Sequence, residues 1–278
     1  MYERTSDNNI SVKSVKAQEN IEKNAQVDVS SSSFICKVYG YMAIALLITF
    51  AVAIGFGYGL LAFVNSAIAA EDIEGLGGAL LFEIISIVVS SIGLLVCSII
   101  ISIRGIRMKR SITVPGILYT VFMGVLMSSI VVTALEGYEN GFILFISAFA
   151  LTAVAFAIMY FIGKAAKNLN WLGFLGIGLL VGSVLIGTVV ALLMLIPGVS
   201  AVIEISLIWV LIAVIAIFYI AMLLLMTYDT WRIQKIAESG MQSNNMALFC
   251  AFIIYQDFVY LFLKILRILL IIFGKSKK

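Results

Sequence analysis

Seven long runs of apolar residues, separated by short polar connections, make up the chain after its first 33 residues. Each run is close to the ~20 residues with which an α-helix crosses the ~30 Å hydrocarbon core of a bilayer. Because open strands leave backbone groups unpaired in lipid, all seven runs are predicted to be helices. Their approximate ranges are 38–63, 79–103, 112–135, 141–163, 173–196, 204–228 and 246–273. The pattern therefore predicts an all-α integral membrane protein with seven transmembrane helices.

The first 33 residues are polar, with acidic and basic side chains interspersed and a serine run at Ser30–Ser33. Such a composition predicts a disordered tail, followed by a transmembrane domain over residues 34–278. The tail lacks the basic start, short apolar core and small-residue cleavage site of a signal peptide, so the first span is expected to be retained.

Charged residues make up only 12% of the chain, against about 25% in an ordinary soluble domain, and they alternate in sign between the connections. Basic residues fill three connections and acidic residues fill the other three. The basic positions are Arg104, Arg107, Lys109 and Arg110, then Lys164 and Lys167, then Arg232 and Lys235; the acidic ones are Glu71, Asp72, Glu74, Glu136, Glu139 and Glu204. The positive-inside rule then predicts a cytoplasmic amino terminus.

The carboxyl terminus departs from this alternation, because Lys275, Lys277 and Lys278 make it basic although seven spans would place it outside the cytoplasm. Either the last run is a seventh span or it re-enters the membrane and returns to the cytoplasm. Earlier helices usually dominate orientation, so seven spans are favoured.

The composition excludes several kinds of chemistry. The chain has no histidine, which rules out a histidine-based triad, a histidine metal site and an imidazole pH switch. Its three cysteines are isolated in apolar sequence, which argues against a disulfide framework or a zinc site. The net charge of +3 gives no indication of nucleic-acid binding, and no cofactor is expected.

Two aspartates carry the functional hypothesis. Asp257 lies in the middle of the last run, and Asp229 follows Tyr228 at the predicted cytoplasmic end of the sixth. A carboxylate at membrane depth costs roughly 2.5–3.5 kcal/mol on insertion scales, so such residues are functional candidates. If the two carboxylates meet, they should hold one proton between them and sense pH; fully deprotonated, they would suit Ca²⁺. For them to meet, either the sixth helix continues past Trp231 to Ile236, or Met246–Phe252 run partly outside the hydrocarbon.

Arg104 and Arg107, at the predicted cytoplasmic end of the second helix, can pair with these carboxylates.

Two glycine patterns stand out in the apolar runs. Gly178 and Gly182, four residues apart, are expected to let helices approach closely. The stretch GFGYG at Gly55–Gly59 looks like a potassium filter, but it is expected to continue inside the first helix.

At the two aspartate motifs the sequence resembles the Bax inhibitor family, the transmembrane Bax-inhibitor-motif proteins, in its bacterial branch. The resemblance covers roughly residues 34–274. It rests on Val38-Tyr39-Gly40-Tyr41-Met42, on Tyr228-Asp229-Thr230 with Arg232-Ile233, on Tyr255-Gln256-Asp257-Phe258 with Leu261-Phe262-Leu263, and on Leu266-Arg267-Ile268-Leu269. The sequence departs from the family at Gln256, where Leu is common, and at Val259-Tyr260, where Ile-Asn is common.

The resemblance implies a seven-helix fold with the last helix central, and a pH-sensitive calcium leak governed by the aspartates that match Asp229 and Asp257. It also implies that an arginine near the end of the second helix, Arg104 or Arg107, latches the closed state. The expected function is a calcium leak channel, not an enzyme, with the bilayer, Ca²⁺ and protons as partners. The isoleucine- and lysine-rich character of the chain favours a bacterial plasma membrane.

Two other functions were considered. A non-transporting regulator of a membrane protease or of cell-death and stress machinery, with membrane proteins as partners, is the main alternative; in it the aspartates would only brace the bundle. Intramembrane aspartyl proteases also place one aspartate on helix six and one on helix seven. Their helix-seven motif G-x-G-D is absent here, where residues 254–257 read Ile-Tyr-Gln-Asp.

Overall fold

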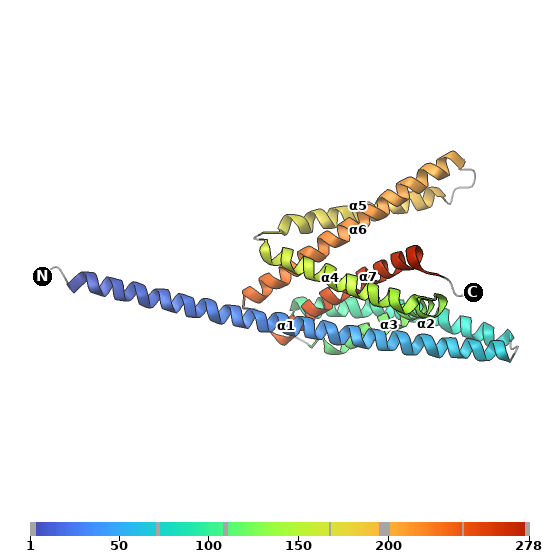
Figure 1. The fold of residues 1–278 in the computed structure, drawn as a ribbon, viewed down its shortest axis with the longest axis horizontal. Coiled ribbons are helices and arrows are strands. Elements are labelled where there is room, and N and C mark those ends of the chain that lie inside the picture. The colour runs from blue at the N-terminus through green and yellow to red at the C-terminus, as the bar shows by residue number, and fades with distance from the viewer. Residues whose placement is uncertain are drawn as a thin grey trace. The chain divides into compact units, whose positions relative to one another are not determined.

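The computed structural model describes residues 4–70, 73–107, 111–166, 168–194, 201–240 and 242–275. Side chains are described within these ranges except at 4–30, 73, 106, 191, 193–194, 201–208 and 211. The regular elements of the described ranges are seven α-helices (Figure 1). In order they are α1 (Arg4–Ala69), α2 (Ile73–Arg107), α3 (Thr113–Gly137), α4 (Gly141–Ala165), α5 (Asn170–Met194), α6 (Ala201–Glu238) and α7 (Asn244–Phe273).

All seven helices contain a stretch that is long and apolar enough to cross a membrane, which confirms the predicted seven-span, all-α architecture. The chain is therefore an integral multi-pass membrane protein surrounded by lipid. Its last helix is a single uninterrupted helix of 30 residues, about 45 Å long, as expected of a seventh span rather than of a re-entrant segment.

The first helix extends beyond the apolar run that predicted it. Its membrane-crossing stretch covers Ser31–Ala69, and the helix itself begins at Arg4. The side chains of residues 1–30 lie outside those that the structure describes. The disordered tail over residues 1–33 and the domain boundary at residue 34 stay predictions.

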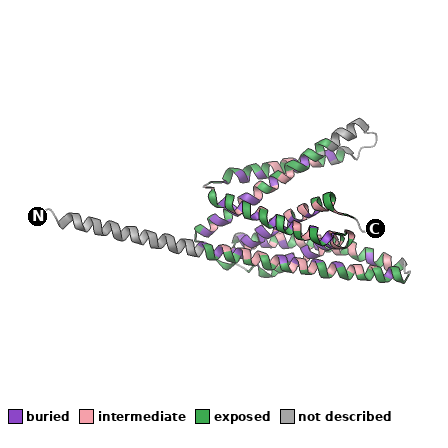
Figure 2. Cartoon of the chain, viewed as in Figure 1, coloured by how far each residue is buried: buried purple, intermediate pink, exposed green. Residues whose placement is uncertain are grey.

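The chain forms two compact units, each with its own internal contacts. Unit 1 comprises Met1–Phe149 and Lys235–Lys278, and unit 2 comprises Ala150–Gln234. Within unit 1, α3 and α7 form the core: half of the apolar window of α3 and 44% of that of α7 are buried, against 17% for α2. Figure 2 shows exposed positions along most of α2. The last helix contacts α1, α2 and α3, so it holds a central position in this unit.

Two glycines let α1 and α3 approach closely in unit 1. A Cβ on Gly124 would lie 2.7 Å from the carbonyl oxygen of Thr49, and a Cβ on Gly57 would overlap Val132. Gly57 belongs to the GFGYG stretch, which lies inside α1 as expected and serves helix packing.

The expectation that Gly178 and Gly182 bring helices together is wrong. A Cβ on either would meet nothing within 4 Å. The close approach in unit 2 occurs one turn earlier, where Gly173 faces the ring of Tyr228 and Gly176 faces Leu225. Because four-residue spacing marks one face of any helix, the spacing alone did not reveal which face of α5 meets α6.

The two ends of unit 1 carry different connections. At one end, Ser31 of α1 donates to the carbonyl of Ala237 near the end of α6 (3.0 Å), and Gly105 of α2 faces the ring of Phe249 in α7. The α2–α3 and α6–α7 connections therefore share an end.

At the other end of unit 1, the carboxyl terminus is held against the α3–α4 connection. The backbone N–H of Glu139 donates to the carbonyl of Lys275 (2.8 Å), and the side-chain amide of Asn140 donates to the carbonyl of Phe273 (2.9 Å). The basic tail starts where the acidic α3–α4 connection lies, which places Lys275 near Glu139 despite the positive-inside rule.

This arrangement predicts which positions a membrane-impermeant maleimide reaches together. In a variant with Cys36, Cys97 and Cys250 replaced by alanine, single cysteines at Glu139 and Lys275 should label from one side of sealed vesicles, because hydrogen bonds join these positions. A cysteine at Ser239, in the α6–α7 connection, should label only from the other side. Labelling of Lys275 together with Ser239 would contradict the arrangement.

Candidate functional site

The polar motif of α7 joins this helix to two neighbours. The hydroxyl of Tyr255 lies 2.6 Å from that of Thr49 on α1, and the amide of Gln256 donates to the hydroxyl of Tyr119 on α3 (2.7 Å). Successive residues of a helix point about 100° apart, so one helix can bond two neighbours through adjacent positions. These two bonds fix the rotation of α7 about its axis. They therefore fix the direction of Asp257, which follows directly and is half-buried.

The hydroxyl of Thr49 is the centre of this linkage. It is fully buried and donates toward the carbonyls of Ala45 (3.0 Å) and Thr120 (3.2 Å). Its single proton is used there, so the Tyr255 hydroxyl acts as the donor between the two side chains. Three helices, α1, α3 and α7, thus meet at one buried hydroxyl.

On the carboxyl-terminal side of Asp257, an aromatic cluster holds α7. Phe258 packs on Phe149 with 5.3 Å between ring centroids, and Phe262 packs on Phe50 (5.3 Å) and Phe145 (5.2 Å). The two pairs of Phe262 are edge-to-face and the Phe258–Phe149 pair is tilted. Aromatic pairs contribute about 0.5–1.5 kcal/mol each beyond area burial. Asp257 therefore sits between a hydrogen-bonded section and an aromatic section of a rigidly held helix.

Asp229 lies on α6 in unit 2, where the helix is held by α4 and α5. The ring of Tyr228 packs over Gly173, and Gly163 of α4 lies against the backbone of Trp231. One turn further on, the amide of Gln234 donates to the carbonyl of Tyr160 (3.1 Å). The helix continues to Glu238, nine residues past Asp229, which meets one of the two conditions under which the aspartates could pair. Asp229 itself is half-buried.

Two further features of α6 surround this aspartate. The hydroxyls of Thr227 and Thr230 donate to the carbonyls four residues earlier, which leaves Asp229 as the polar side chain between them. Trp231 is 8% exposed and packs with Leu169 and Leu172, and its indole N–H has no hydrogen-bond partner among the residues that the structure describes. A buried donor without a partner costs about 1–3 kcal/mol. This part of α6 therefore has a buried donor without a hydrogen bond, whereas Tyr255 and Gln256 of the α7 motif are both hydrogen-bonded.

The two arginines proposed as a latch differ in their surroundings. Arg104 is half-buried and donates from Nη1 to the carbonyl of Ser111 (3.2 Å) across the α2–α3 connection, whereas Arg107 is exposed. Lys109 and Arg110 lie outside the described residues. Arg104 is thus the arginine that contacts protein, and Arg107 is exposed.

Asp257 belongs to unit 1 and Asp229 to unit 2, so the sharing of a proton between them stays a prediction, as does the latch. Within the described residues, no group of three or more His, Cys, Asp or Glu side chains gathers as a metal site would require. A cation held by the two aspartates would therefore need most of its six to eight oxygen ligands from water and backbone carbonyls.

Sequence reasoning missed a third carboxylate at membrane depth. Glu83 lies ten residues into α2, about 15 Å from its start, and its Oε1 accepts from the hydroxyl of Ser129 on α3 (2.6 Å). Glu83 is half-buried. The available signal was its position inside the predicted span 79–103.

The chain is thus a multi-pass membrane protein with seven spans, and its last helix carries the motif Tyr-Gln-Asp with a carboxylate inside the span. A protein-family profile described as "Inhibitor of apoptosis-promoting Bax1" matches residues 31–275. The chain therefore belongs to the Bax inhibitor family. No curated protein and no solved structure matches it.

The bond between Gln256 and Tyr119 predicts a measurable coupling. Gln256→Leu should lower the free energy of unfolding by about 0.5–1.5 kcal/mol, because the Tyr119 hydroxyl loses a donor. Tyr119→Phe should cost a similar amount, and the double variant should fall short of the sum by roughly 0.6 kcal/mol, the average for side-chain hydrogen bonds in membranes. Reversible unfolding in mixed micelles measures the free energy of unfolding of the parent, of the two single variants and of the double variant.

The matched control combines Gln256→Leu with Tyr58→Phe, since Tyr58 bonds Glu136 at the far end of α1 and α3. These two changes should add within about 0.3–0.5 kcal/mol. Equal coupling in both pairs would show that the Gln256 bond does not contribute specifically.

Proposed function

We propose that this protein is a pH-sensitive cation leak channel, with Ca²⁺ as the permeant ion and Asp229 and Asp257 as its proton-sensing pair. Membership of the Bax inhibitor family supports a multi-pass membrane protein, and the calcium leak is what the resemblance to that family implies. The single observation that carries the proposal is the position of both aspartates inside uninterrupted membrane-crossing helices. Asp229 lies within the span Ile212–Glu238 and Asp257 within Asn244–Phe273. Carboxylates at such depth are costly unless they serve a function.

The chemistry of two carboxylates fits both proton sensing and ion passage. In a chain without histidine, carboxyl groups can sense protons near neutral pH when burial or a neighbouring carboxylate raises their pKa. Two carboxylates alone supply few of the oxygens that Ca²⁺ takes, so binding would be weak. Weak binding suits conduction, which requires that an ion leaves as readily as it arrives.

The gate follows from charge. In the closed state a guanidinium would hold an ionised aspartate, and protonation of that aspartate would remove the attraction and release the helix. We assign the latch to Arg104, because its guanidinium is half-buried whereas that of Arg107 is exposed.

The remaining parts of the proposal concern the orientation of the protein, the membrane that holds it and the absence of a catalysed reaction. The amino terminus and the basic connections would face the cytoplasm by the positive-inside rule, and the bilayer would be a bacterial plasma membrane. The protein would use no cofactor and catalyse no reaction.

Ca²⁺ flux into proteoliposomes tests the proposal. Flux through the parent protein should rise severalfold as the pH falls from 8 to 6, because protonation weakens the latch. Asp229→Asn or Asp257→Asn should abolish that dependence, since an amide neither ionises nor binds the guanidinium as strongly. Arg104→Gln should raise flux at pH 8 to the level seen at pH 6, and Arg107→Gln should not.

Glu238→Gln is the matched control, because this exposed carboxylate on the same helix pairs only at the surface with Lys235 (2.7 Å). It should keep the pH dependence of the parent. An absence of flux above empty liposomes at every pH, in protein shown to be folded, would overturn the channel proposal and favour a non-transporting membrane regulator.

A further inference from the structure

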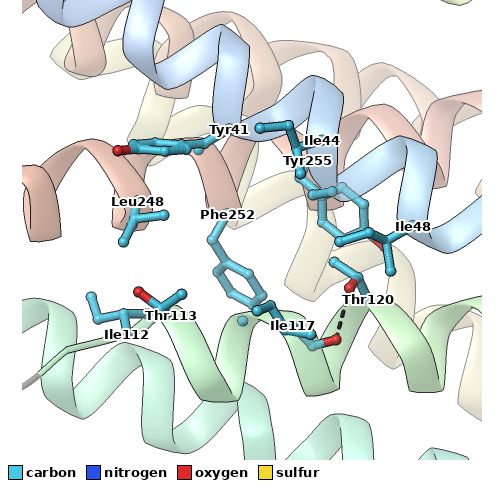
Figure 3. A pocket seen from close by; sticks show the side chains of 13 residues that line it. Tyr41, Ile44, Ile48, Ile112, Thr113, Ile117, Thr120, Leu248, Phe252 and Tyr255 are labelled. Atoms are coloured by element: carbon cyan, nitrogen blue, oxygen red, sulfur yellow. Dashed lines mark hydrogen bonds between the residues drawn. The ribbon is translucent and has the colours of Figure 1, made fainter.

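A cavity of about 360 Å³ lies among α1, α3 and α7 in unit 1. Figure 3 shows Tyr41, Ile44 and Ile48 of α1 on one side and residues of α3 on the other, with Phe252 of α7 between them. The cavity opens toward the surrounding lipid, because Ile44 and Ile117, which border it, are 55% and 47% exposed. Its inner wall is formed by the buried residues Phe252 and Tyr255.

The interior of the cavity is apolar. Thr120 and Tyr255 bring hydroxyls to its inner end, but Thr120 already donates to the carbonyl of Ile117 (2.7 Å) and Tyr255 is bonded to Thr49. Cavities whose polar groups are already paired hold no stable water and accept apolar molecules. The occupant should therefore be a hydrocarbon.

The length of the cavity suits a narrow chain. From Thr113 to Thr120 the cavity follows α3 for seven residues, about 10 Å. A flexible hydrocarbon of that length, such as part of one lipid acyl chain, matches the apolar interior.

The mouth of the cavity is polar and lies beside basic residues. Thr113 borders it, and its hydroxyl lies 3.0 Å from that of Ser111, whose carbonyl accepts from Arg104. The exposed Arg107 ends α2 before the same connection. Basic groups beside a gap between transmembrane helices attract anionic lipid headgroups, at about 1 kcal/mol for each Lys or Arg.

We propose that this cavity binds one acyl chain of an anionic phospholipid, whose phosphate lies beside Arg104 and Arg107 at the end of α2. The apolar interior matches the acyl chain, the lipid-facing opening lets the chain enter from the bilayer, and the basic rim matches the phosphate. The site lies within unit 1, does not include Asp229 or Asp257, and does not depend on ion flux.

Photolabelling tests the proposal. The parent protein in phosphatidylcholine bilayers receives a trace of phosphatidylglycerol with a diazirine on one acyl chain, and the labelled residues are mapped by mass spectrometry. Label should concentrate on Ala45, Gly116 and Ala251, which line the cavity, over the neighbouring lipid-facing Leu47 and Leu118. Phosphatidylcholine with the same diazirine should label the cavity residues at least about fivefold less than phosphatidylglycerol does.

Cavity-filling variants supply matched controls. Gly116→Leu adds a side chain where a Cβ meets nothing within 4 Å, and it should reduce cavity labelling severalfold; Gly59→Leu, equally unhindered and outside the cavity, should not. Ala45→Phe and the exposed Ala43→Phe form a second pair, which keeps the test decisive if Gly116→Leu fails to fold.

The charge of the rim is tested separately. Arg107→Gln should reduce the preference for phosphatidylglycerol severalfold, whereas Lys275→Gln at the other end of unit 1 should preserve it. Label spread evenly over all lipid-facing residues, or unchanged by both cavity-filling variants, would overturn the acyl-chain site. Equal labelling by the two lipids would overturn the anionic headgroup.

Discussion

The absence of hydrogen-bonding solvent in the hydrocarbon core is the constraint on which the structure depends. Backbone groups satisfy it by forming helices, and most hydroxyls satisfy it locally by bonding a carbonyl one turn earlier, as Thr227 and Thr230 do. Only a few polar side chains reach across to another helix. In unit 1 these include the Tyr255–Thr49, Gln256–Tyr119 and Ser129–Glu83 bonds. Such bonds are worth only about 0.6 kcal/mol on average, yet they select one rotation of each helix among many similar packings.

This selection matters most for α7. Apolar packing alone tolerates small rotations of a helix, because one aliphatic side chain replaces another at little cost. Bonds from adjacent residues to two different helices do not tolerate them, because a rotation that preserves one bond breaks the other. Asp257 therefore has a defined direction before any charge acts on it. A carboxylate used as a sensor needs this, since its interaction with a partner falls steeply once the geometry of a charged hydrogen bond is lost.

Hydropathy and length predicted the number, type and approximate position of all seven helices, because the bilayer imposes both on any spanning segment. The same reasoning found Asp257 and Asp229, which stand out against apolar sequence. It failed where the outcome depends on which face of a helix meets which neighbour. Gly178 and Gly182 have the right spacing, but Gly173 and Gly176 make the contact. Glu83 was missed because its partner, Ser129, lies 46 residues away and is unremarkable in the sequence.

The position of Tyr255 links the cavity to the rotation of α7. Its ring forms part of the inner wall of the cavity, and its hydroxyl makes the bond to α1. A chain that fills the cavity packs against this ring and so favours the rotation in which the ring stays in place. By reciprocity, if a change of charge at Asp257, two residues later, turns α7, it must change the affinity of the cavity by the same free energy. Lipid occupancy and protonation would then be coupled through one helix, with a strength limited by the difference in lipid affinity between the two rotations.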